Sequence, residues 1–259
     1  MSAFGVKADV SQSVVNAIFR EWFEGAIAMD VLILPGLDGT GDMLADFAAH
    51  LGEVHNVHIF SYPKHEALNY DDLSKLVATD LPEDTPYCLL AESFSGPIAT
   101  RLAAEKPRGL QAVVFAASFV KKPSFFPRAF AGFANLTPAN SPTLLKLATP
   151  ITFGKWSTRE LNALLVESVR AVSSKVLAYR IREAMGADEL WRFTGLDVPM
   201  LYIRPSHDRL VSSGAAKEMS RLNPALGVVD VEGPHFILQA KPEECSAIVA
   251  DFLDSTLKN

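Results

Sequence analysis

From Asp30 onward, short apolar runs alternate with segments that carry the amphipathic spacing of helices. This alternation is typical of a doubly wound α/β fold, because neighbouring parallel strands need a crossover connection that a helix supplies. Right-handed crossovers restrict the topology further. We therefore predict a mostly parallel sheet of about six strands with helices on both faces. The expected strands are residues 30–35, 57–62, 86–92, 110–118, 199–204 and 227–232.

The alternation stops between residues 121 and 190, where no strand is expected. The second half of this segment has the spacing of two helices, over residues 158–171 and 173–185. We interpret it as a helical cap insert packed over one end of the sheet. Its phenylalanines either line a substrate pocket or form the private core of the insert. The candidate substrate-binding side chains are Phe125, Phe126 and Phe130.

The segment before the first strand is a separate unit in this interpretation. Residues 14–27 place apolar side chains on one face of a helix, and Met29 directly precedes the first apolar strand. We expect the core to begin near Met29. The predicted division is an N-terminal helical extension at 1–28, a core at 29–120 and 191–259, and a helical cap insert at 121–190.

Composition excludes several classes of function. The chain has 24 Lys and Arg against 30 Asp and Glu, and this net charge of -6 argues against nucleic acid or an anionic membrane as partner. It contains no run of 18 apolar residues and no apparent secretory signal, so we expect no membrane span and a cytoplasmic location. The two cysteines, Cys88 and Cys245, are expected to be core thiols and cannot build a cysteine-based zinc site.

The stretch LLAESFSGPIAT, residues 89–100, places a serine where a buried strand turns into a helix. A serine on such a sharp turn is held above the sheet, and small residues are needed around it. Ala91 and Ser95 flank Ser93 at two residues on either side, and Pro97 suits a first helical turn. Taken alone, Ser93 could simply cap the helix. Ser95 is the rival nucleophile, but it would place Pro97 where a small residue is needed.

Ser93 requires a base and a carboxylate to act as a nucleophile. In this topology, functional groups lie in loops beyond the carboxyl ends of strands. Asp208 follows strand 199–204 and His235 follows strand 227–232, so each loop supplies one missing group. The chain order Ser93, Asp208, His235 is the order of the hydrolase triad. The weaker candidates are His207 and the histidines 50, 55, 58 and 65 for the base, and Asp188, Asp197 and Asp230 for the acid.

The first strand ends in a glycine-rich loop, LPGLDGTG, at residues 34–41. Backbone N–H groups in such a loop can bind the oxyanion of an acyl-transfer intermediate. The candidates are the N–H groups of Leu37 and Phe94. A phosphate-binding loop is the alternative, but the chain lacks both the Gly-Lys-Ser/Thr of a P-loop and the G-x-G-x-x-G spacing of a dinucleotide site here.

In their order and spacing, the stretches LLAESFSG, PMLYIRPSHDRLV and VEGPHFILQAKPEECSAIVADFL resemble the alpha/beta-hydrolase superfamily, over about residues 29–259. The resemblance implies the alpha/beta-hydrolase fold, with nucleophile Ser93, acid Asp208 and base His235, and a cap at the position of the insert. Two motifs depart from the family pattern. Pro35-Gly36 stands where members often have His-Gly, and Ala91-Glu92 stands where Gly-His is common.

These residues predict a serine hydrolase that cleaves a carboxylic ester or thioester of a small to medium apolar acyl group, with no metal and no organic cofactor. An acyltransferase or a cofactor-free perhydrolase would use the same three residues with another acceptor. A non-catalytic ligand-binding protein is the third possibility. Asp38 and Glu92 bring negative charge near the site. They could hold the loops, raise the pKa of the histidine or disfavour anionic substrates.

Overall fold

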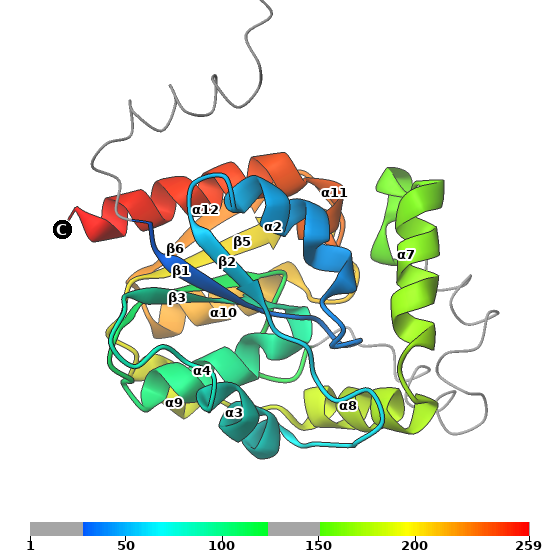
Figure 1. Cartoon of the computed structure of the whole chain (residues 1–259), viewed down its shortest axis with the longest axis horizontal. Coiled ribbons are helices and arrows are strands. Elements are labelled where there is room, and N and C mark those ends of the chain that lie inside the picture. The colour runs from blue at the N-terminus through cyan, green and yellow to red at the C-terminus, as the bar shows by residue number, and fades with distance from the viewer. Residues whose placement is uncertain (1–27, 124–150, 259) are drawn as a thin grey trace, which may run out of the picture.

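The computed structural model describes residues 28–123 and 151–258 of the chain. Within these ranges the fold is a six-stranded sheet in the order β2-β1-β3-β4-β5-β6, and every strand pairing is parallel. The predicted fold class is therefore confirmed (Figure 1). The strands are β1 (Asp30–Leu34), β2 (Asn56–Ile59), β3 (Tyr87–Glu92), β4 (Leu110–Ala116), β5 (Met200–Pro205) and β6 (Leu226–Val231).

The central strands are apolar because both of their faces are covered. Every residue of β3 is buried, as expected for a parallel strand between two helical layers. The edge strand β2 differs, since it pairs on one side only and most of its side chains are exposed. It ends at Ile59 rather than at the predicted residue 62, although the Phe60 N–H still donates to the Ile33 carbonyl at 2.9 Å.

Helices cover both faces of the sheet, as Figure 1 shows. On one face, α2 (Ala45–Leu51) and α12 (Pro242–Leu257) bury apolar side chains against the strands, and the short α11 (Ile237–Ala240) precedes α12. On the other face lie α3 (Tyr70–Ala78), α4 (Gly96–Ala104), α9 (Leu190–Thr194) and α10 (Ser213–Leu222). Cys88 and Cys245 are free and buried within the first of these layers, as predicted.

The two ends of the insert lie side by side at the edge of the core. Lys121 and Asp188 form an isolated antiparallel bridge, and the Lys122 N–H donates to the Ala187 carbonyl at 2.8 Å. The described part of the insert contains η3 (Gly154–Trp156), α7 (Arg159–Arg170) and α8 (Ser174–Gly186), so both predicted helices form. The division into extension, core and cap stays a prediction, because residues 1–27 and 124–150 lie outside the described part.

No helix in the described ranges is long and apolar enough to cross a membrane.

Candidate active site

Ser93 lies at the abrupt junction between β3 and the helical turn η2 (Ser93–Ser95), which leads directly into α4. Its φ is 45°, in the left-handed region that non-glycine residues rarely adopt. The Ser118 hydroxyl, just beyond β4, donates to the Ser93 carbonyl at 2.7 Å. Crowding is greatest at Gly96, where a Cβ atom would come within 2.3 Å of the Phe119 carbonyl oxygen. A glycine is therefore needed at this position, three residues after the serine.

The structure brings the three residues predicted for catalysis into one chain of hydrogen bonds. The Ser93 Oγ lies 2.9 Å from Nε2 of His235, and Nδ1 of the same ring lies 2.8 Å from Oδ2 of Asp208. Ser93 follows β3, Asp208 follows β5 and His235 follows β6, so Ser93 lies 142 positions and Asp208 27 positions before His235 along the chain. With a proton on Nδ1, the Nε2 atom is free to accept the serine proton.

The carboxylate of Asp208 is fixed by its own loop. Its Oδ1 accepts hydrogen bonds from the N–H groups of Leu210 and Val211, both at 2.8 Å, which leaves Oδ2 to bind His235. Both side chains are almost fully buried. Burial alone would lower the pKa of His235, but the Asp208 charge and hydrogen bond, together with the Glu92 charge, raise the pKa above its usual value.

The rival nucleophile and the rival base have other roles in the structure. Ser95 is fully buried, donates its hydroxyl proton to the Pro35 carbonyl and accepts from the Tyr62 hydroxyl at 2.7 Å. His207 is exposed, and its Nδ1 lies 2.8 Å from the hydroxyl of the adjacent Ser206. Ser95 therefore has no histidine partner, and His207 bonds to its exposed neighbour Ser206 and not to Ser93.

The rival acids lie away from His235. Asp188 sits in the bridge at the base of the insert. Asp197 pairs with Lys106 at 2.9 Å, and Asp230 pairs with the Arg204 guanidinium on the surface. The carboxylates of Asp197 and Asp230 are therefore engaged in other ion pairs.

The two predicted oxyanion donors lie at the ends of neighbouring strands. Leu34 at the end of β1 pairs with Ala91 in β3, so Leu37 and Phe94 both follow at the same edge of the sheet. Phe94 directly follows the serine, and its carbonyl is held by the Tyr70 hydroxyl at 3.1 Å. Tyr70 also stacks on the Phe94 ring at a centroid distance of 4.8 Å. This placement is compatible with the predicted role of the two N–H groups.

Glu92, at the end of β3, connects the glycine-rich loop to α11. One carboxylate oxygen accepts from the Gly36 N–H at 3.2 Å, and the other accepts from the Gln239 side chain at 2.8 Å. The side chain is 3% exposed, and this burial raises the pKa of Glu92 to about 7. Of the roles left open by the sequence, the geometry favours holding the loops and raising the pKa of His235.

The Asp38 side chain is hydrogen-bonded to Thr40 in its own loop. Its Oδ1 accepts from the Thr40 N–H at 2.9 Å and from the Thr40 hydroxyl at 2.5 Å. The side chain thus closes a tight turn of the glycine-rich loop, a behaviour common for Asp in loops.

Sequence reasoning missed three side chains that hold the site: Ser118, Gln239 and Arg180. Arg180 is the most unexpected, because it is a 1% exposed arginine on α8 that binds the glycine-rich loop. A signal existed in the sequence, since Arg180 falls at an apolar position of the helix, beside Leu177 and Ile181. Gln239 carries a similar signal, because it is the one polar residue in the apolar stretch between His235 and Lys241.

Apolar side chains stand next to the imidazole. Phe236 packs edge-on against His235, with ring centroids 5.5 Å apart, and Phe153 packs on Phe236 at 5.1 Å. Met43 and Leu165 complete this cluster, which joins α7 to the site. The predicted substrate-binding residues Phe125, Phe126 and Phe130 lie outside the described residues. Phe153 is therefore the phenylalanine of the insert that the structure places near the base.

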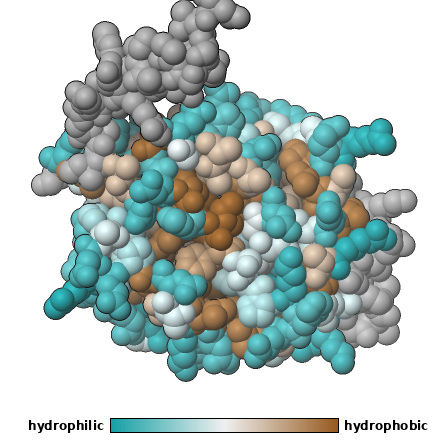
Figure 2. All heavy atoms as spheres, viewed as in Figure 1, coloured by the Kyte–Doolittle hydropathy of each residue, from teal (hydrophilic) through white to brown (hydrophobic). Residues whose placement is uncertain are grey.

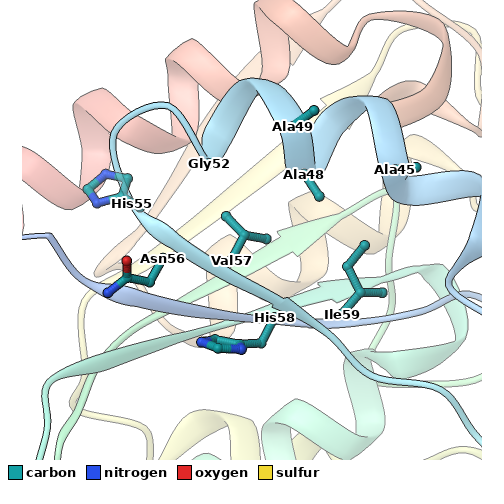
Figure 3. Close-up of a pocket in the computed structure, with 9 residues that line it drawn as sticks. All are labelled: Ala45, Ala48, Ala49, Gly52, His55, Asn56, Val57, His58 and Ile59. Carbon is teal, nitrogen blue, oxygen red and sulfur yellow. The ribbon is translucent and has the colours of Figure 1, made fainter. Parts of the chain in front are cut away.

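A surface depression of about 740 Å³ lies elsewhere, between α2 and the edge strand β2. Figure 3 shows its lining, which includes His55, His58 and Ile59 but none of the predicted site residues. Figure 2 shows hydrophobic residues gathered near the centre of this face of the molecule. The depression is open and shallow, so the hydrogen-bonded geometry, not the hollow, identifies the candidate active site.

The described ranges contain no group of three or more His, Cys, Asp or Glu side chains that could hold a metal ion.

The model of the alpha/beta hydrolase family matches residues 31–248, and the chain belongs to this family. An enol-lactonase from Burkholderia xenovorans LB400 has the same fold, with a TM-score of 0.76 and 17% identity over 89% of this chain and 93% of that one. A bromoperoxidase from Bacillus anthracis gives a TM-score of 0.74 and 17% identity over 88% and 92%. At these identities the likeness shows the fold alone.

A curated relative is phytyl ester synthase 2, chloroplastic, from Arabidopsis thaliana. The two sequences are 27% identical over 122 residues, which is 45% of this chain. The matched part is only 17% of the length of that relative.

Proposed function

We propose that the protein is a serine hydrolase that cleaves a carboxylic ester or thioester of an apolar acyl group through an acyl-enzyme on Ser93. The single observation that carries the proposal is the chain of hydrogen bonds from Ser93 through His235 to Asp208. The strained backbone of Ser93 supports it, since strain of this kind gathers at functional sites. The membership of the alpha/beta hydrolase family supports the general class of reaction.

In the proposed acylation, the Ser93 Oγ attacks the acyl carbonyl carbon while its proton passes to Nε2 of His235. The oxyanion is bound by the N–H groups of Leu37 and Phe94. The intermediate collapses as the bond to the leaving oxygen or sulfur breaks, and His235 returns the proton to that atom. Water then attacks the acyl-enzyme with His235 as base, and the acid and Ser93 are released. Asp208 stabilises the imidazolium in both steps.

An acyltransferase is the second candidate, because a match over nearly half of the chain leads to a protein named as an ester synthase. An alcohol would then replace water in the second step. The two reactions share the same acyl-enzyme, so the product distinguishes them. Incubation with an aryl ester and increasing concentrations of a long-chain alcohol, followed by product analysis, gives free acid from a hydrolase and a new ester from an acyltransferase.

Ser93→Ala tests the nucleophile. We expect the variant to fold, to lose stoichiometric labelling by a fluorophosphonate, and to lose hydrolysis of aryl esters by several powers of ten. Ser95→Ala is the comparison variant and should still be labelled to full stoichiometry, because Ser95 bonds to Pro35 and Tyr62 and not to a histidine. Near-normal hydrolysis by Ser93→Ala would refute the proposal. A panel of aryl esters and acyl-thioesters of graded chain length would then define the acyl group.

A further inference from the structure

The glycine-rich loop that carries Leu37 is held by a buried arginine from the insert. Arg180, on α8, points its guanidinium at this loop and is 1% exposed. Room for the guanidinium depends on Gly39, where a Cβ atom would come within 2.4 Å of Nη1. Gly39 also has a φ of 68°, which an alanine would adopt only with strain. The guanidinium therefore fits against the loop because residue 39 is a glycine.

All three acceptors of Arg180 are backbone carbonyl oxygens. Its Nη1 donates to the carbonyls of Leu37 at 3.2 Å and Asp38 at 2.6 Å, and its Nη2 donates to Pro63 at 3.0 Å. The guanidinium also lies 5.5 Å from the centre of the Tyr62 ring. Burial of a guanidinium is costly unless its hydrogen bonds are satisfied. An arginine that only anchored α8 could do so from the surface, so its burial here calls for another explanation.

The contacts of Arg180 complete a set that fixes every peptide plane from Pro35 to Gly39. The Gly36 N–H donates to Glu92, and the Pro35 carbonyl accepts from Ser95. The next plane is fixed by the Gly39 N–H, which donates to the Gly36 carbonyl at 3.0 Å. Arg180 then fixes the carbonyls of the last two planes.

None of these contacts uses the N–H of Leu37, which shares its peptide plane with the Gly36 carbonyl. The direction of this N–H is therefore set by the Gly36 carbonyl, which the Gly39 N–H holds. That N–H lies in the same peptide plane as the Asp38 carbonyl, so Arg180 fixes it through Asp38 and fixes the intervening plane through the Leu37 carbonyl.

We infer that Arg180 is a positioning residue that aims the Leu37 N–H at the oxyanion and so couples the helical insert to the chemical step. The inference rests on the proposed function, in which this N–H is an oxyanion donor. Displacing an oxyanion donor lowers kcat, because the interaction is made in the transition state and not with the ground-state carbonyl. Loss of a whole donor typically costs 10²- to 10³-fold, so a displaced one should cost about 10- to 100-fold.

The test compares Arg180→Ala with Arg182→Ala, an exposed position on the same helix. We expect Arg180→Ala to lower kcat for an aryl ester with KM changed by less than about threefold. Fluorophosphonate should still label it to the same final stoichiometry. Millimolar guanidinium should restore part of kcat, because it can occupy the space left by the side chain. A merely structural role would not give rescue by this ion.

Arg180→Lys provides a second variant in case Arg180→Ala fails to fold. A lysine keeps the charge, but a single ammonium cannot reach three carbonyls in the planar arrangement of a guanidinium, so kcat should still fall. A kcat equal to that of Arg182→Ala, in either variant, would overturn the inference. So would a loss in Arg180→Ala that guanidinium does not reduce. Failure of the proposed function is seen separately, as retained hydrolysis in Ser93→Ala.

Discussion

Replacing Glu92 by glutamine should change how the stability of the protein depends on pH. Burial of the carboxyl group raises the pKa of Glu92 from 4.5 to about 7. The folded state therefore binds more protons than the unfolded state between these two values, and the free energy of unfolding falls as pH rises through this window. Above it, the shift of about 2.5 pH units corresponds to a cost of about 3 kcal/mol, at 1.36 kcal/mol per unit.

Glu92→Gln removes this cost and keeps the shape of the side chain. The new amide oxygen can accept from the Gly36 N–H, and its amide group can bond to Gln239 after that side chain rotates by half a turn. Such a rotation would engage the Gln239 Oε1 atom, which is buried and has no hydrogen-bond partner among the described residues. Most of the expected change falls between pH 5 and pH 8, where the wild type should lose about 2.5 kcal/mol relative to the variant.

Urea denaturation of both proteins at pH 5 and pH 8 measures this double difference directly. Glu53→Gln, at an exposed position, is the matched control and should show almost no change. Because Glu92 also raises the pKa of His235, the comparison should be repeated in a His235→Gln background, where the effect should persist. A double difference below about 1 kcal/mol would mean that Glu92 ionises as if it were in water, and would refute this reasoning.

Two further predictions concern the reaction. In Glu92→Gln, the loss of the negative charge should lower the pKa of His235, so the acidic limb of the kcat/KM profile for an aryl ester should move to lower pH. An unmoved limb would show that the Glu92 charge does not raise the pKa of His235. Asp208→Asn should lower kcat by about 10⁴-fold while the fold is kept, because the asparagine no longer fixes the tautomer of His235. Asp230→Asn, at a surface ion pair, is the control, and equal rates for the two variants would exclude Asp208 as the acid.

Much of the sheet could be predicted because its chemistry is simple. Strands buried on both faces, such as β3, are continuous apolar runs, and a pattern of this kind is visible in the sequence. The predicted end of β2 is wrong because β2 is an edge strand and most of its side chains are exposed. Its outer edge has no partner strand among the described residues, so the apolar pattern over 57–62 does not determine where pairing stops.

The positions of Ser93, Asp208 and His235 could be predicted because topology places the carboxyl ends of parallel strands at one edge. This argument gives the neighbourhood of a side chain but not its contacts. It therefore left several roles open for Asp38 and Glu92, although both lie where the sequence suggested. Whether a carboxylate binds Gly36, Thr40 or water depends on ångström-scale placement, which no spacing in the sequence records.

Glu92 and Arg180 act on the glycine-rich loop from separate parts of the chain, and no local pattern in the sequence shows that they contact the same loop. The Glu92 carboxylate accepts a hydrogen bond from an N–H of the loop, and the Arg180 guanidinium donates to carbonyl oxygens of the loop. Each side chain therefore offers the hydrogen-bonding group that its partner in the loop needs. Both are buried charges, and burial of a charge opposes folding unless hydrogen bonds compensate for it. A core built only for stability would use apolar residues at these two positions. Both buried charges lower the stability of the fold. Their presence is explained if a fixed direction of the Leu37 N–H is worth more to the protein than the stability that is lost.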